Sequence, residues 1–287
     1  MDVDDLRGSS LSREEASAKH PTIGGGMQYH IRCKPGDSGR YVLLPGDPDR
    51  VPMIGRLWDS AKEISTHREY RVWSGSIGGV KVTACSTGIG GPATAIALEE
   101  LASIGADTFI RVGSCGALRQ EVKPGDLAIA TGAVRLDGTS RQYVGLEYPA
   151  VPSYDATLAL IEAAEKLGFR YHLGYTASAD SFYVGQGRPG FRHYLPAESE
   201  KIVSSLASVR VLSFEMEAAT IFTLSGIYGL RAGCVCAVYA NRITDEFRIA
   251  GEEEACRTAV EAVRILSKWD RDREGRGKPY WYPSLSF

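Results

Sequence analysis

Short apolar runs alternate with amphipathic stretches along most of the chain. The apolar runs predict buried strands at residues 41–44, 108–112, 127–134, 172–177 and 232–240. Apolar positions at helical spacing predict helices at residues 93–104, 155–167, 200–206, 215–228 and 252–269. Residues 70–75 and 80–85 predict a hairpin. Because strands and helices alternate, we expect an α/β domain with a parallel or mixed sheet between helices.

The pattern predicts one domain rather than two, because it contains no internal repeat and no interior linker. A polar, acidic stretch that ends in three glycines predicts a flexible extension at residues 1–26. The domain then occupies residues 27–287, and its last part, residues 270–287, is a basic and aromatic tail.

Composition narrows the classes of function. The chain has 287 residues, with 33 Lys and Arg against 35 Asp and Glu, which gives a net charge of −2. Without a basic excess, nucleic acid is not an expected partner. A membrane is not expected either, because no apolar run approaches the roughly 20 residues that span a bilayer. The six cysteines form no CxxC pair, which favours buried thiols in a reducing compartment, and the cytoplasm is the expected location.

Residues 181–188, SFYVGQGR, combine an aromatic ring, an amide and a guanidinium in one short segment. Phe182 can stack on a planar ring, Gln186 has both a donor and an acceptor, and Arg188 is a rigid fork of donors. Gln186 and Arg188 can together pair with the C2=O, N3–H and C4=O groups of uracil, while an adenine edge leaves some of these groups unpaired. The alternative interpretation is a glycine-rich surface loop with a packed phenylalanine.

Three glycine-containing segments after predicted strands can bind an oxyanion. Gly46 allows a backbone N–H to approach an anion, and Arg50 adds charge-assisted hydrogen bonds. Arg111 and Ser114 flank a second glycine, and residues 86–92 place small residues at a predicted helix start. The fingerprints of dinucleotide sites and P-loops are missing. Each arginine alone is typical of a solvated surface, but together the segments favour inorganic phosphate or a phosphate ester.

Residues 214–219, FEMEAA, are predicted to begin a helix. Acids in a first turn also interact favourably with the helix dipole, which is the alternative interpretation of Glu215 and Glu217. As a binding group, a carboxylate here can accept hydrogen bonds from the 2′- and 3′-hydroxyls of ribose and stabilise positive charge at C1′. Met216 between them can pack against the sugar.

Together these residues resemble the nucleoside phosphorylase family, and its uridine-specific members most closely. The resemblance covers nearly the whole chain and rests on a combination of motifs: PGDPDR, HRE, STGIGGP, RVGSCGA, SFYVGQGR, FEMEA and ANR. It implies a central mixed, partly barrel-like sheet flanked by helices. It also implies reversible phosphorolysis, in which uridine or deoxyuridine reacts with inorganic phosphate to give uracil and the sugar 1-phosphate. Phosphate is then a co-substrate, and no cofactor is required.

The resemblance assigns roles to residues of this chain that match these motifs. It assigns phosphate binding to Gly46, Arg50, Arg68, Arg111 and Ser114. It assigns ribose binding to His30, Glu215, Met216 and Glu217, and base binding to Phe182, Gln186, Arg188 and Arg242. The implied catalytic residues are Arg111, Glu217, Gln186 and Arg188.

Arg68 and His30 are implied to act in the site of a neighbouring subunit, so the resemblance implies a homo-oligomer with a dimer as its minimal active unit. It also implies an intersubunit cation, K⁺ or Ca²⁺, at Glu69 and the carbonyl of Ile89. Ala93 stands where bacterial relatives have a serine at this site, so we expect the cation site to be lost or changed.

Other functions fit parts of the pattern. Phosphorolysis of purine nucleosides predicts an aspartate directly after the last core strand, and this chain has Asp245 several residues further on. A nucleosidase needs no phosphate-binding arginines. A catalytically silent nucleoside-binding protein is expected to lose Arg111, Glu217 or Gln186, which are all present. An oxidoreductase is disfavoured by the missing dinucleotide fingerprint.

Overall fold

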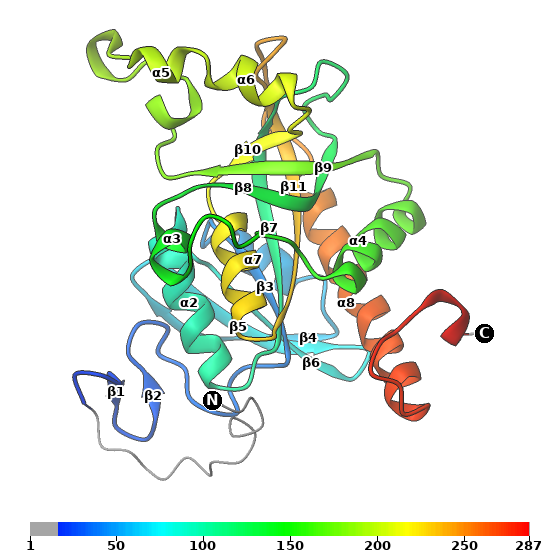
Figure 1. Ribbon diagram of the computed structural model, residues 1–287. Helices are drawn as coiled ribbons and strands as arrows, with labels where there is room; N and C mark the ends of the chain where they lie inside the picture. Colours follow the sequence, from blue (N-terminus) through cyan, green and yellow to red (C-terminus); the bar gives the residue numbers. More distant parts are fainter. Residues whose placement is uncertain (1–16, 287) are drawn as a thin grey trace.

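A ten-stranded mixed sheet forms the centre of the molecule (Figure 1). The computed structural model describes residues 17–286. The strands of this sheet are β3 (Tyr41–Pro45), β4 (Ser60–His67), β5 (Tyr70–Ile77), β6 (Val80–Cys85), β7 (Thr108–Ala117), β8 (Leu127–Leu136), β9 (Tyr171–Ala179), β10 (Ser213–Glu215), β11 (Arg231–Asn241) and β12 (Glu246–Phe247). The predicted α/β class is confirmed.

Strand β7 is the junction of the sheet, because it pairs with three other strands. It lies parallel to β3 and β11 and antiparallel to β10. Since β11 pairs with β8, β8 with β9, and β9 with β10, these strands and β7 close a ring. Strands β6, β5 and β4 continue the sheet beyond β3 as an open part. The partly barrel-like sheet that the resemblance implied is therefore present.

Helices cover both faces of the sheet (Figure 1). The helices on one face are α2 (Gly91–Ser103) and α7 (Ala218–Ile227), and those on the other are α1 (Arg50–Gly55), α4 (Tyr154–Leu167) and α8 (Glu252–Gly275). Because side chains alternate along a strand, β7 contributes to both cores: Phe109 packs with α2 and α7, while Ile110 and Val112 pack on the opposite face. Arg111 thus projects on the same face as Phe109, toward the start of α7. The shorter helices are α3 (Thr139–Tyr143), α5 (Ala197–Glu200) and α6 (Ile202–Ser208).

The helix predicted at residues 215–228 begins later than expected. Phe214 and Glu215 belong to β10, which pairs with β7 and β9, and α7 begins only at Ala218. The prediction of a helical Glu215 was therefore wrong. Glu215 and Glu217 resemble the acids of a first helical turn, and no glycine or proline separates β10 from α7, which is why the sequence placed the helix start too early.

Strands β4 and β7 and helix α8 also differ from the prediction. Strand β4 was not predicted, because this edge strand is mostly polar and exposed. Strand β7 continues to Ala117 rather than ending at 112, so Arg111 lies well inside the strand rather than near its end, and Ser114 lies within the strand rather than after it. Helix α8 continues to Gly275, so the first part of the predicted tail is helical.

Most of the predicted extension at residues 1–26 lies outside the described residues, which begin at residue 17. Strand β1 (Thr22–Ile23) pairs with β2 (Met27–Gln28), and this hairpin crosses the predicted boundary. In the tail, Trp281 stacks on Trp269 of α8 with ring centroids 3.7 Å apart. No helix within residues 17–286 has the length and apolar character needed to cross a bilayer.

Candidate active site

A cavity of about 1240 Å³ opens where the segments that follow β3, β6, β9, β10 and β11 meet β7. Ligand sites of α/β proteins are typically found at such strand ends. The predicted site residues that line the cavity are Gly46, Arg50, Glu69, Ile89, Arg111, Ser114, Phe182, Gln186, Arg188, Glu215, Met216, Glu217 and Arg242. The fold thus brings together residues from segments that are far apart in the sequence.

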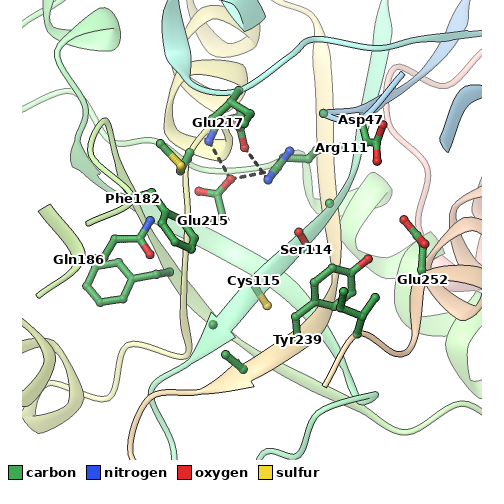
Figure 2. A pocket seen from close by; sticks show the side chains of 18 of the residues that line it. Asp47, Arg111, Ser114, Cys115, Phe182, Gln186, Glu215, Glu217, Tyr239 and Glu252 are labelled. Atoms are coloured by element: carbon green, nitrogen blue, oxygen red, sulfur yellow. Dashed lines mark hydrogen bonds and ion pairs between the residues drawn. The ribbon is translucent and has the colours of Figure 1, made fainter. Parts of the chain in front are cut away.

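The Arg111 guanidinium lies between two carboxylates (Figure 2). Its Nε lies 2.8 Å from Oε2 of Glu215, and its Nη2 lies 2.5 Å from Oε2 of Glu217. All three side chains are buried, with at most 5% exposure. Burial acts against the charge of Arg111, but Glu217 and Glu215 hold its pKa well above the usual value. The three groups therefore form one charged unit in the wall of the cavity.

Glu215 holds both the start of α7 and the side chain of Arg111 in place. Its Oε2 accepts hydrogen bonds from the backbone N–H groups of Glu217 and Ala218, each at 2.8 Å, and its Oε1 accepts one from the Ser178 hydroxyl. Burial raises the pKa of Glu215 to about 7, although Arg111 acts in the opposite direction. Since its oxygens are used in this way, Glu215 is a positioning residue rather than the main ligand of a substrate.

Glu217 links two helix starts across the cavity wall. It occupies the N-cap of α7, and its Oε1 accepts a 2.6 Å hydrogen bond from the backbone N–H of Gly90, the N-cap of α2. Gly90 has a φ of 90°, a conformation that favours glycine. A carboxylate oxygen can accept two hydrogen bonds, so each oxygen of Glu217 retains capacity for a sugar hydroxyl. Met216 lines the cavity beside it.

One end of the cavity carries an amide and two guanidiniums. Arg188 donates hydrogen bonds from Nη1 to Oε1 of Gln186 at 2.6 Å and to the carbonyl of Phe182 at 2.7 Å, while Nη1 of Arg242 donates to the backbone carbonyl of Gln186 at 2.9 Å. Burial, with Arg242 nearby, lowers the pKa of Arg188 to about 10. Two neighbouring cations favour a ligand with carbonyl oxygens or negative charge at this end.

The ring of Phe182 already contacts two neighbouring side chains. The guanidinium carbon of Arg188 covers one face, 4.0 Å from the ring centroid, and the ring of Tyr183 makes an edge-to-face contact with 5.4 Å between centroids. Phe182 itself is half exposed, whereas Gln186 is buried within a short 3₁₀ turn, Val184–Gln186. The predicted aromatic contact with a planar ring is therefore restricted to one side.

Two of the residues assigned to phosphate, Ser114 and Arg50 with its partner Glu252, lie at the end of the cavity away from Gln186. Figure 2 shows Asp47, Ser114 and Glu252 on the side away from Gln186. The loops after β3 and β6 touch, since a Cβ on Gly46 would lie 3.0 Å from the carbonyl oxygen of Gly88. Backbone N–H groups, a hydroxyl and guanidiniums are the usual ligands of an oxyanion, so this end suits one.

Arg68 and His30 are the predicted site residues that do not line the cavity. Arg68 lies in the turn between β4 and β5, and its guanidinium carbon is 5.9 Å from the ring centroid of Tyr29. Nδ1 of His30 lies 2.7 Å from Oε1 of Glu100, whose carboxylate also accepts the backbone N–H groups of His30 and Ile31. Neither side chain therefore reaches the cavity of its own chain.

Glu69 and Ile89, the predicted cation ligands, lie at the rim of the cavity. Among the described residues there is no cluster of three or more His, Cys, Asp or Glu side chains able to hold a metal ion. One carboxylate and one carbonyl are fewer donors than the roughly six to eight oxygens that surround Ca²⁺. Glu69 and the carbonyl of Ile89 alone therefore supply too few oxygens to surround such an ion.

Sequence reasoning missed several groups of the site. Glu252 and Tyr239 line the cavity from α8 and β11, and Ser178 holds Glu215 from β9. Gly113 separates Arg111 from Cys236: a Cβ on Gly113 would lie 2.7 Å from the guanidinium carbon and 2.8 Å from the sulfur. The motif at residues 111–117 contains this glycine, but only the fold puts the arginine and the thiol on either side of it.

Comparisons with known proteins match nearly the whole chain. Residues 40–268 match the family model described as the phosphorylase superfamily. Uridine phosphorylase from Thermococcus kodakarensis is 62% identical over 269 residues, which covers 94% of this chain and 97% of that protein. Uridine phosphorylase from Escherichia coli is 42% identical over 251 residues, covering 83% and 97%. Guanosine phosphorylase from Halorubrum lacusprofundi is 40% identical over 227 residues, covering 79% and 89%.

Substitution Gly113→Ala tests whether Arg111 binds an oxyanion. The added methyl group occupies the space between the guanidinium and Cys236, so it displaces Arg111 from its carboxylates. We expect the affinity for inorganic phosphate, measured by equilibrium dialysis, to fall by about tenfold or more. Gly275→Ala is the control, because a Cβ there meets nothing within 4 Å. Phosphate affinity equal to that of the control, in a variant with Arg111 displaced, would contradict this role.

Proposed function

The chain belongs to the phosphorylase superfamily, and we propose that it catalyses the reversible phosphorolysis of uridine by inorganic phosphate to uracil and ribose 1-phosphate. The observation that carries the proposal is the arrangement of three kinds of group along one cavity. An amide with two guanidiniums lies at one end, the carboxylate of Glu217 in the middle, and a set of oxyanion ligands at the other end. The base, the sugar and the attacking phosphate lie in the same order in space when the reactants are aligned for the reaction.

In this mechanism the cavity orients the reactants and stabilises charge. Gln186 and Arg188 bind the uracil edge, Glu217 accepts hydrogen bonds from the ribose hydroxyls, and Arg111 holds phosphate close to C1′. The bond between C1′ and N1 of the base breaks, and its electron pair leaves with uracil. A phosphate oxygen supplies the electron pair of the new bond to C1′, and the proton that hydrogen phosphate loses passes to the uracil anion to give neutral uracil. No electron is gained or lost overall, so the proposed reaction needs phosphate as co-substrate and no redox cofactor.

Charge develops at both ends of the breaking bond. The sugar becomes positive, and the carboxylate of Glu217 and the phosphate oppose that charge. The departing uracil becomes negative, next to Arg188 and Arg242. Burial lowers the pKa of both arginines, so the cavity favours a ligand that brings negative charge to them. This preference is greater for the leaving uracil than for neutral uridine, which lowers the barrier.

A second candidate is phosphorolysis of purine nucleosides. Asp245 lines the cavity close to Arg242, and a carboxyl group at the base end could exchange a proton with a purine nitrogen. The similarity to guanosine phosphorylase supports this candidate, although the match to uridine phosphorylase from T. kodakarensis has the higher identity. Gln186 and Arg188 fit the uracil edge better, so we place uridine first.

The proposed reaction is tested by incubating purified protein with uridine, with and without phosphate, in parallel with inosine and guanosine. We expect uracil release that requires phosphate, and little or no turnover of the purine nucleosides. Release without phosphate would point to a hydrolase. Turnover of purine nucleosides alone would mean that the segment at residues 181–188 does not read uracil, and no turnover at all would favour a nucleoside-binding protein.

We further propose a homodimer in which each subunit completes the site of the other. Arg68 and His30 lie outside their own cavity, and both carry groups that suit phosphate and a sugar hydroxyl. A K⁺ or Ca²⁺ ion held by Glu69 and Ile89 of two copies stays part of this proposal. So does a cytoplasmic location, which is supported by six buried thiols without disulfides among the described residues.

Mixing two inactive variants tests the shared site. Arg68→Ala removes a group given to the neighbour, and Glu217→Ala removes one from the same subunit's own cavity. When the two variants are unfolded and refolded together, random dimers contain one site with both changes and one with neither, so we expect roughly a quarter of wild-type activity to return. Each variant refolded alone is the control. A mixture no more active than the variants refolded alone would contradict a site built from two subunits.

A further inference from the structure

Arg50, which is assigned to phosphate binding, already forms an ion pair with a carboxylate of its own chain. Its Nε donates to Oε1 of Glu252 at 2.7 Å, and its Nη2 lies 2.6 Å from the same oxygen. Nη1 donates to the carbonyl of Val112 at 3.1 Å, and Nη2 also donates to the hydroxyl of Tyr239 at 3.3 Å. All three nitrogens of the guanidinium are therefore engaged, and the Nε–Nη2 edge, which suits oxyanions best, holds a carboxylate.

Glu252 is held at this place by a rigid helix start. It is the first residue of α8, and its N-cap, Gly251, has a φ of 82°. A Cβ on Gly251 would lie 2.8 Å from the carbonyl oxygen of Gly125, so the helix start packs closely against that loop. The backbone of Glu252 is thus fixed, while its side chain, 28% exposed, keeps a route to solvent.

Phosphate and Glu252 compete for the same donors. Glu252 lines the end of the cavity to which phosphate is assigned. Arg50 is only 6% exposed, so its guanidinium cannot turn to a separate partner in solvent. A phosphate dianion that reaches Arg50 through its remaining N–H would lie next to a like charge, because the guanidinium holds both. Like charges at such short range oppose binding unless one of them moves away.

We propose that Glu252 is an internal competitor of phosphate, which lowers the affinity of the site for oxyanions and leaves Arg50 when phosphate binds. The proposal rests on the proposed function, in which inorganic phosphate enters this end of the cavity. When Glu252 returns to Arg50, it displaces the phosphate group of ribose 1-phosphate and speeds its release. Arg111 differs, because its carboxylates lie within the cavity wall and hold it in place throughout.

The structure also allows the opposite role to be tested. A carboxylate can orient an arginine so that its remaining donor meets the substrate, and removing such a positioning residue weakens binding. Competition predicts the reverse sign, since removing the carboxylate then strengthens binding. Loss of structure cannot produce tighter binding, so the direction of the change separates the two roles.

The experiment compares Glu252→Gln with wild type and with Glu253→Gln. Glutamine keeps the size of the side chain and an acceptor for Arg50 but removes the charge. Glu253 is exposed in the same helical turn, so its substitution matches the change in net charge without touching Arg50. For each protein we measure KM for phosphate, KM for uridine and kcat. Inhibition by sulfate, an unreactive dianion of the same shape, reports binding alone.

For Glu252→Gln we expect KM for phosphate and the inhibition constant of sulfate to fall by about fivefold or more, with KM for uridine unchanged. Glu253→Gln should behave as wild type. Glu252→Asp, whose carboxylate is too short to reach Arg50 but keeps the acid at the helix start, should also lower KM for phosphate, and it replaces the first variant if that one fails to fold.

A rise in KM for phosphate in Glu252→Gln, or no change, would overturn the proposal. Failure of the proposed function is recognised separately, because wild-type protein would then release no uracil in a phosphate-dependent reaction. In that case sulfate and phosphate binding to the same variants, measured by calorimetry, still decides whether Glu252 competes with an oxyanion at Arg50.

Discussion

The burial of the Arg111 guanidinium is the constraint on which the rest of the site depends. A charge that is 5% exposed is tolerated only with opposite charge in contact, and removing a partner from such a group costs about 3–5 kcal/mol. Glu215 at the end of β10 and Glu217 at the start of α7 supply that charge. The join between β10 and α7, the start of α2 and the middle of β7 are therefore held in one arrangement by a single arginine.

Charge is balanced differently in the three parts of the cavity. At Arg111 the compensating carboxylates are built into strand and helix ends, which suits a group that must stay in place. At Arg50 the compensating carboxylate is the partly exposed Glu252, which suits a group that exchanges partners. At the base end, Arg188 donates to an amide and a carbonyl, so positive charge is left for the ligand to balance. The way in which positive charge is compensated therefore changes from the phosphate end of the cavity to the base end.

Much of the site could be predicted because its residues lie in short, distinctive motifs. The segments around Gly46, Gln186 and Glu217 each combine a chemically distinctive side chain with a local turn or helix start, and these signals are local in the sequence. The buried strands could be predicted for the same reason, since apolar runs such as 41–44 report burial directly.

The remainder depends on contacts that no local pattern contains. The pair between Arg50 and Glu252 joins residues 202 positions apart, so Glu252 looked like an ordinary acid in the first turn of a helix. Closure of the strands into a ring depends on the pairing of β10 with both β7 and β9, and β10 is too short to be recognised. Ser114 was expected after a strand because the glycines of 113 and 116 resemble a turn, whereas pairing with β11 extends β7 through them.

Arg111 and Glu217 act as one unit, and a double-mutant cycle tests this coupling most directly. Kinetic constants for uridine phosphorolysis would be measured for Arg111→Gln, Glu217→Gln and the protein with both changes. We expect each single change to lower kcat/KM by about 100-fold or more, and the second change to add little once the first is made. Effects of the two changes that multiply independently would contradict it.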